Sequence, residues 1–354
     1  MNYKPILICL IFLTLSFSCV GNKSSEKKIS KPEYVNIPKN TTLKFTSGIS
    51  AMFQDSKGFY WFGSLQEGVA VFDGNSFRYF TVNEGLSDNQ IRSIQEDKNG
   101  IIWINTAHGL STYDGIRITN NILIINNFSQ NIWTKTDNDL WFNPGNKEGV
   151  YQYNGQNLKY LAFPQSKVIN PNNVYFITDI SKGKNNMIWF ATYAGVFGYN
   201  GINFSIINDE TLGLNINTEP LHIRSILEDS KGRLWIGNNG IGVLLKDADT
   251  IINFSEKNNL IHPTSSRKGD KSRPGTLEHV FAIEEDLKGN IWFGDRDAGI
   301  WKYDGKNMTN YTKKDGLTNN FAYSIFEDKK GDLWFGMVDG NIFKFNGNTF
   351  DKQF

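Results

Sequence analysis

The chain has little cysteine, since only Cys9 and Cys19 occur among its 354 residues. Both lie in the first 19 positions, so the rest of the chain cannot form a disulfide and must be stable through packing alone. Blocks of like charge are also missing. The formal net charge is +1 and no long run of one sign occurs, which argues against the basic surface that nucleic-acid binding needs.

Several catalytic signatures are absent as well. The sequence has no Gly-x-Ser-x-Gly elbow, no glycine-rich phosphate loop and no His-Glu-x-x-His motif, which mark hydrolases, nucleotide-binding proteins and zinc proteases. Only four histidines occur. We therefore expect no cofactor, and an incomplete metal site at most from His222 and His279, which occupy equivalent positions of neighbouring repeats.

The N-terminus reads "MNYKPILICLIFLTLSFSC", with Lys4, an apolar run from Ile6 to Phe17 and a small residue before Cys19. The pattern resembles a bacterial lipoprotein signal. The run is shorter than the ~20 residues of a spanning helix. An ordinary signal peptide and a short membrane anchor are the alternatives.

These features predict three segments. Residues 1–18 are a signal peptide, 19–41 a flexible, lysine-rich tether lipidated at Cys19, and 42–354 the folded domain. The protein is expected to be exported and lipid-anchored to the cell envelope. The outer membrane is favoured, because Val20 is not the aspartate that retains some lipoproteins at the inner membrane.

The sequence does contain one repeated motif. "EDKKGDLWFG" at 327–336 matches "EDSKGRLWIG" at 228–237, "EDLKGNIWFG" at 285–294 and "EDKNGIIWIN" at 96–105. The tryptophan recurs seven times, at Trp61, Trp103, Trp141, Trp189, Trp235, Trp292 and Trp334. Seven units of about 44 residues therefore fill the chain from Gly48 to Phe354.

Each unit reads as four short strands. An Asp-x-x-Gly turn joins the first two strands, and an Asp-Gly or Asn-Gly turn usually follows the third. Sheets of this size bury their faces by stacking around an axis, so the sequence predicts an all-β, seven-bladed β-propeller of four-stranded antiparallel blades. The ring is expected to close without a shared blade. The recurrent Glu-Asp pair lies at the tight turn and is interpreted as structural, and the tryptophan is expected to be wedged between blades.

The segments "DGLTNNFAYSIFEDKKGDLWFGMVDGNIFKFNGNTF" and "EGLSDNQIRSIQEDKNGIIWINTAHGLSTYDG" resemble the two-component regulator propeller repeat. Unit three departs from the pattern by a shortened turn, and unit four, "ISKGKNNMIWFA", by a longer one. The resemblance implies periplasmic ligand sensing. Signalling by this chain alone is not implied, since it has about half the usual number of repeats.

Candidate site residues follow from aligning the inner strands. One apolar column, expected to pack between blades, is Ile49, Ile91, Ile132, Val174, Ile223, Val280 and Ala322. The columns on either side should lie at the mouth of the central channel, on the face with the longer loops. They place there, together with one loop arginine, the predicted ligand-binding residues Arg92, Trp133, Tyr175, His222, Arg224, His279, Arg296 and Tyr323. Aromatics that only fill gaps between blades are the alternative.

One loop on the same face is exceptional. The segment 261–280, "IHPTSSRKGDKSRPGTLEHV", is long and carries four basic residues. A long loop in a compact domain is either functional or merely mobile. We interpret it as a solvated loop or, alternatively, as a lid that contacts anions.

The sequence thus favours a non-enzymatic, monomeric binding module. It would recognise a glycan-like or other small ligand, or a protein partner, and attach to the membrane through its lipid. The alternative is a metal-assisted enzyme, by resemblance to the streptogramin lyases, with His108, His222 and His279 as candidates. Convergence of His222 and His279 with Glu278 or Asp297 would favour the enzyme.

Overall fold

The computed structural model describes residues 41–120, 122, 124–125, 132–164, 173–184, 186–215 and 217–354. The predicted signal peptide, the lipidation site Cys19 and all but the last residue of the tether lie outside these residues. Within the described ranges, no helix combines the length and the apolar character needed to cross a membrane.

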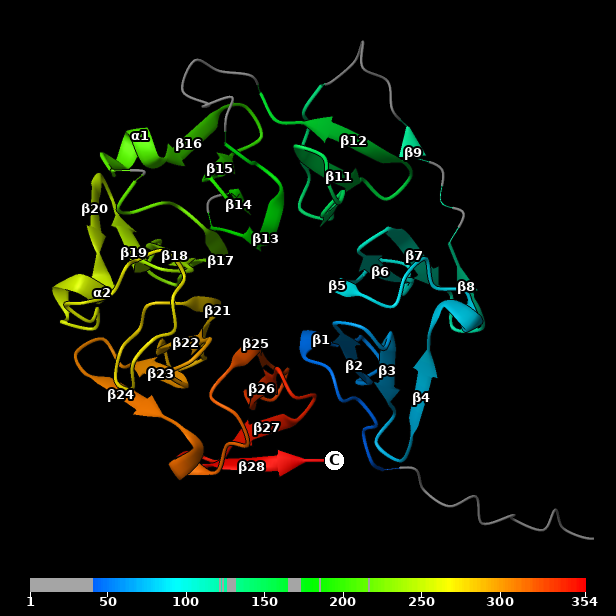
Figure 1. Cartoon of the computed structure of the whole chain (residues 1–354). Helices are drawn as coiled ribbons and strands as arrows, with labels where there is room; N and C mark the ends of the chain where they lie inside the picture. The colour runs from blue at the N-terminus through cyan, green and yellow to red at the C-terminus, as the bar shows by residue number, and fades with distance from the viewer. Residues whose placement is uncertain are drawn as a thin grey trace, which may run out of the picture. The chain divides into compact units, whose positions relative to one another are not determined.

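Seven four-stranded sheets are arranged around a central channel, which confirms the predicted fold (Figure 1). Blade one holds β1 (Ile49–Gln54), β2 (Tyr60–Ser64), β3 (Val69–Phe72) and β4 (Phe77–Phe80). Blade two holds β5 (Ile91–Glu96), β6 (Ile102–Thr106), β7 (Gly109–Tyr113) and β8 (Ile118–Thr119). Blade three holds β9 (Ile124–Ile125), β10 (Leu140–Phe142), β11 (Gly149–Tyr153) and β12 (Leu158–Ala162).

The remaining blades repeat the pattern. Blade four holds β13 (Ile177–Lys182), β14 (Ile188–Thr192), β15 (Gly195–Tyr199) and β16 (Phe204–Asn208). Blade five holds β17 (Ile223–Glu228), β18 (Leu234–Asn238), β19 (Gly242–Asp247) and β20 (Thr250–Asn253). Blade six holds β21 (Val280–Glu285), β22 (Ile291–Asp295), β23 (Ile300–Tyr303) and β24 (Met308–Tyr311). Blade seven holds β25 (Ala322–Glu327), β26 (Leu333–Met337), β27 (Ile342–Phe345) and β28 (Phe350–Gln353).

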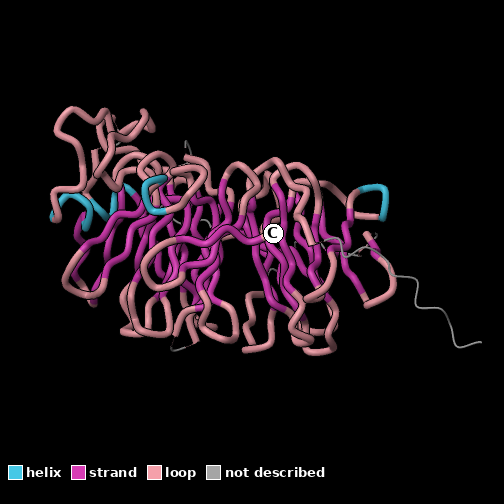
Figure 2. Tube along the Cα trace, turned by 90° about the horizontal axis from the view of Figure 1, so that it is seen from below, coloured by secondary structure: helices cyan, strands magenta, loops and turns pink. Residues whose placement is uncertain are grey.

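Among the described residues, four helical turns lie in the links after outer strands: η1 (Val82–Glu84), α1 (Asp209–Leu212), α2 (Phe254–Lys257) and η3 (Lys313–Asp315). Seen edge-on, one group of loops, at the upper left, projects well beyond the other loops of the ring (Figure 2). Blade three is irregular. Its β9 pairs with β12 in parallel at the outer edge, whereas the other six blades are antiparallel throughout.

The repeated tryptophan is tied to the repeated turn. In blade one, Asp55 accepts hydrogen bonds from the turn amides of Lys57 and Phe59 through Oδ1, and from the indole of Trp61 through Oδ2 at 2.9 Å. The same aspartate–indole bond recurs at Trp103, Trp235, Trp292 and Trp334. One carboxylate thereby ends the first strand, shapes the turn and satisfies a buried indole.

The glutamate of each Glu-Asp pair acts on the preceding blade. Glu96 accepts a hydrogen bond from the turn amide of Ser56 at 2.7 Å, across the seam between blades two and one. Glu228, Glu285 and Glu327 accept equivalent bonds from Lys184, Ser230 and Leu287. These contacts support the structural interpretation of the pair.

In blade four the indole of the repeated tryptophan has a different hydrogen-bond acceptor. Gly183 stands where five of the other turns have aspartate, and a Cβ there would lie only 2.2 Å from Glu228 Oε2. That space lets Glu228 of blade five accept the indole hydrogen bond of Trp189, at 2.5 Å. The expected longer turn is therefore wrong: the spacing from Ile177 to Trp189 equals that from Ile91 to Trp103, and both pairs occupy equivalent positions in the strands.

Packing between blades is aromatic and aliphatic, as predicted for the tryptophans. Trp235 is fully buried in blade five and packs against Phe293 of blade six, with ring centroids 5.6 Å apart. Burying such a side chain removes a large apolar area from water. The seams between successive blades are the hydrophobic core.

The ring closes without a shared blade, because β1–β4 come from the start of the domain and β25–β28 from its end. At the closing seam Gln54 takes the role of the missing glutamate and accepts a hydrogen bond from the Lys329 amide at 3.0 Å. Phe354 packs against Phe62 and Phe77 of blade one. The segment 42–46 adds no strand.

Candidate functional site

A cavity of about 530 Å³ lies at the centre of the ring. Its volume is typical of a pocket for a small ligand. Inner strands supply most of its wall, with Ser50, Arg92, Thr178, Arg224, Phe281 and Tyr323 at one level near the strand starts. Loop residues Tyr193, Asn143 and Asn146 complete that end.

Two arginines dominate this level. Arg224 lies over the Phe281 ring at 4.5 Å and faces Tyr193 at 5.8 Å. No ion pair or hydrogen bond of either the Arg92 or the Arg224 guanidinium is found among the described residues. Burial lowers the pKa of Arg92, while Tyr193, Tyr323 and Asp88 oppose that shift. The arginines therefore offer unused donors to whatever enters the channel.

Aromatic rings flank the arginines. Phe281, Phe321 and Tyr323 pack together, with centroid separations between 4.9 and 5.9 Å. Together with Tyr193 they provide flat faces beside the guanidinium groups, an arrangement suited to planar or ring-shaped polar ligands.

Two carboxylates line the same cavity further along the inner strands. Asp179 is one residue beyond the arginine level, and Glu284 is three, about 10 Å. Burial raises the pKa of Asp179 to about 6, although the amides of Ile226 and Ile180 oppose the shift. Burial raises the pKa of Glu284 to about 8, helped by Glu327 and Asp179. The channel is thus cationic near its mouth and acidic within.

The rim beside the cavity is a chain of polar contacts. His222 lies 5.1 Å from the Tyr193 ring and contacts the Asn239 amide at 3.3 Å. Arg296 reaches Asn239 Oδ1 at 3.4 Å, and its backbone amide donates to the His279 carbonyl at 2.9 Å. Burial and Arg296 lower the pKa of His279 to about 4. His222, His279 and Arg296 therefore lie on the rim rather than in the cavity wall.

Two predicted residues lie elsewhere. Trp133 stacks on Trp141 and packs edge-on against Tyr199, and Tyr175 is buried against Phe197. Both belong to the hydrophobic core around blade four. Placing them at the mouth was wrong, because the alignment was out of register in blades three and four.

The same error affects the apolar column. Ile132 and Val174 are 65% and 44% exposed, whereas Ile49, Ile91 and Ile223 are almost fully buried. Ile177 occupies the equivalent position in blade four, which brings Thr178 and Asp179 to the channel. With that register, Asp179 stands out from the sequence, because other blades have serine or alanine there. Glu284 and Tyr193 were also missed, since neither lies in the columns considered.

The long loop is held by specific contacts. Arg267 pairs with Glu219 at 2.5 Å and with Glu256 at 3.0 Å. Arg296 donates to the carbonyls of Gly269 and Asp270 at 3.1 and 2.7 Å. The basic residue Arg267 is thus committed to neighbouring carboxylates and not to the channel.

The histidines proposed for an enzyme do not converge. His108 pairs with Asp88 in blade two, and His222 contacts Asn239. A group of potential ligand atoms in the described part of the chain does include His279 and Glu278, with Asp270 as third member and without His222.

Comparison with known proteins supports the repeat. The family model described as "Two component regulator propeller" matches residues 85–108, 219–240 and 316–339. A curated relative, "Histidine kinase P4" of Formosa agariphila, is 25% identical over 72% of this chain. The match spans 22% of that protein, so the chain corresponds to about a fifth of its relative's length.

Solved structures share the fold. The extracellular domain of a protein described as a hybrid two component system from B. thetaiotaomicron has a TM-score of 0.64 at 20% identity, covering 87% of this chain and 40% of that one. A streptogramin B lyase has a TM-score of 0.62 at 15% identity, covering 89% and 97%. The three matched segments fall in blades two, five and seven. The chain is therefore a seven-bladed propeller, three of whose blades match the two-component regulator propeller repeat.

Proposed function

We propose that this chain is an exported, membrane-anchored binding module of sensory type, whose ligand is a small anionic molecule held in the central channel. The observation that carries the proposal is the pair Arg92 and Arg224. Both line the cavity, and neither guanidinium has an ion pair or hydrogen bond among the described residues. Guanidinium groups bind carboxylate and sulfate through paired hydrogen bonds.

The aromatic faces narrow the ligand class. Phe281 and Tyr323 line the cavity beside the arginines, and such rings pack against sugar rings and other flat polar molecules. An acidic glycan fragment fits both features. A protein partner that inserts an acidic side chain between the arginines is the alternative.

The proposed sensory role and the proposed location in the cell envelope rest on similarity to other proteins. The relatives are a histidine kinase and the extracellular domain of a two-component system, and the N-terminus resembles a lipoprotein signal ending at Cys19. Metabolic labelling with a palmitate analogue should mark the wild-type chain and not Cys19→Ala.

The binding test uses calorimetry with uronate-containing, sulfated and neutral oligosaccharides. Acidic ligands should bind, and Arg92→Met or Arg224→Met should weaken binding at least about tenfold. The exposed arginine variant Arg117→Met is the matched control, since this residue lies at a turn in blade two. Equal binding of neutral sugars, or unchanged affinity in both channel variants, would refute the anionic ligand.

A further inference from the structure

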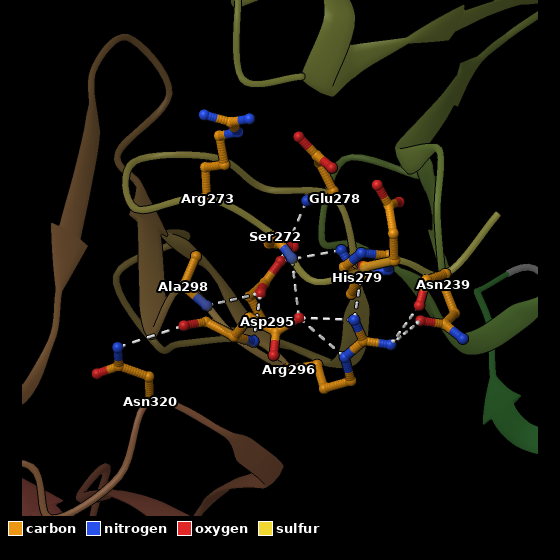
Figure 3. A network of polar contacts seen from close by, with 12 residues as sticks. Asn239, Ser272, Arg273, Glu278, His279, Asp295, Arg296, Ala298 and Asn320 are labelled. Carbon is orange, nitrogen blue, oxygen red and sulfur yellow. Dashed lines mark hydrogen bonds and ion pairs between the residues drawn. The ribbon is translucent and has the colours of Figure 1, made fainter. Parts of the chain in front are cut away.

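The long loop meets the start of β21 at a group of three potential metal ligands. One oxygen or nitrogen atom from each of Asp270, Glu278 and His279 lies within 4.8 Å of the other two. Glu278 is 2% exposed and His279 is fully buried, while Asp270 is exposed on the loop. Figure 3 shows Glu278 and His279 beside Ser272, next to the segment of Asp295 and Arg296.

His279 is unsatisfied in this position. No hydrogen bond of its Nδ1 or Nε2 is found within the described parts of the chain, although the ring is fully buried and faces the Asp270 backbone. The Ser272 hydroxyl, 6% exposed in the same loop, also lacks a partner. Buried polar atoms are nearly always paired, so this concentration of unpaired atoms indicates an occupant.

The backbone and side chains around the group are already fixed. Glu278 accepts hydrogen bonds from the His262 amide at 2.7 Å and the Ser265 hydroxyl at 2.8 Å, one on each oxygen. Each oxygen keeps a lone pair for a metal. The His279 amide donates to Asp295 at 2.9 Å, which orients the start of the strand. Such supporting contacts are what hold metal ligands in place.

The local charge favours a cation. Four carboxylates lie in this network, from Asp270, Glu278, Asp295 and Asp297, and the guanidinium that pairs with one of them is that of Arg296. Arg296 is engaged by Asp297 at 2.7 Å and by the Gly269 and Asp270 carbonyls. Among the described residues no ion pair joins Asp270 or Glu278 to a basic side chain, so the charges of these two carboxylates are available to a metal.

We propose that Asp270, Glu278 and His279 bind a divalent transition metal, with Zn²⁺ as the best match. One imidazole and two carboxylates form a donor set that suits zinc, and three protein ligands leave a position for water. Tetrahedral zinc needs its ligand atoms about 3.3 Å apart. The Asp270 side chain is exposed and can rotate toward the other two ligands while its backbone stays bonded to Arg296, so a bound metal would link the long loop to blade six.

The test adds Zn²⁺ alone to the full chain, produced without a polyhistidine tag. Calorimetry should give one site, and the melting temperature should rise with Zn²⁺. Asp270→Asn should weaken binding at least about tenfold, and this exposed position can be changed without disturbing the core. The control is Asp249→Asn, an exposed carboxylate in the turn between β19 and β20.

A second probe identifies the histidine. Co²⁺ should produce visible absorption in the wild-type chain that is lost in His279→Gln, while circular dichroism shows the fold retained. Absence of Zn²⁺ binding at 100-fold excess would overturn the proposal, as would equal affinity in Asp270→Asn and wild type. None of the three ligands lines the central cavity, so Arg92→Met and Arg224→Met should bind Zn²⁺ normally whatever the fate of the proposed ligand.

Discussion

The two faces of the ring differ in how their polar side chains are paired. At the tight-turn face Asp229 is fully buried and accepts four hydrogen bonds, two of them from Arg233 and Trp235 side chains. At the loop-rich face Arg92, Arg224 and His279 have no such partners in the described structure. His279 is fully buried, and an unpaired buried polar group costs about 1–3 kcal/mol, so the loop-rich face gives up stability that the tight-turn face keeps.

The largest loss of stability should follow from removing a paired carboxylate at the tight-turn face. Asp229→Ala leaves the Trp235 indole and the Arg233 guanidinium without their partner, and removes the acceptor of two turn amides. The free energy of unfolding should fall by about 3–5 kcal/mol, measured by urea unfolding with tryptophan fluorescence. Asp249→Ala, at an exposed turn, should change it by less than about 0.5 kcal/mol. A loss below about 1 kcal/mol for Asp229→Ala would contradict the comparison.

A smaller, pH-dependent effect should come from the acidic part of the channel. Burial raises the pKa of Glu284 from 4.5 to about 8, so the folded state binds the proton more tightly than the unfolded state. The resulting stability is present below about pH 4.5 and is lost as the pH rises to about 8. Glu284→Gln should therefore match wild type at pH 4 and exceed it at pH 9, on the order of 2 kcal/mol.

Denaturant unfolding across this range measures the difference, with the exposed Glu210→Gln as control. Asp179 shares the cavity, and its pKa is raised to about 6, so some pH dependence should persist in Glu284→Gln. If the difference in unfolding free energy between Glu284→Gln and wild type is the same at pH 4 and at pH 9, the Glu284 carboxyl group is solvated and not buried.

The smallest effect concerns the closing seam, where a neutral side chain replaces the usual carboxylate. Gln54→Glu should strengthen the hydrogen bond from the Lys329 amide, since a charged acceptor binds an amide more strongly. We expect a gain of about 0.5–1 kcal/mol in the free energy of unfolding. Gln54→Ala should lose a similar amount. If Gln54→Glu is less stable than Gln54→Ala, the closing seam is not equivalent to the other seams.

The fold could be predicted because one hydrogen-bonded unit repeats. Wherever aspartate and tryptophan keep their spacing, as at Asp286 and Trp292, the positions of turn, strand and seam follow. The prediction failed where the unit changes chemistry. In blade four, Gly183 leaves the space in which Glu228 of blade five binds the Trp189 indole, a role that aspartate has in the regular blades. A carboxylate that the next repeat supplies cannot be recognised from the local sequence.

The site was predictable only in part, for the same reason. Arg92, Arg224 and Tyr323 line the cavity as expected, because their blades keep the common register. Asp270 could not be found from the sequence. It lies in a loop without repeat equivalents, and its approach to His279 depends on how the loop folds back.

The glutamate that crosses each regular seam gives the ring a direction. Glu285 of blade six binds the turn of blade five, and Glu327 of blade seven in turn binds the turn of blade six, so each of these blades resembles a subunit with a head-to-tail interface. Interfaces of that type form a closed ring only when the rotation per unit returns to the start, and otherwise form an open spiral. With seven units, the contact between Gln54 and Lys329 is the point at which that rotation is completed.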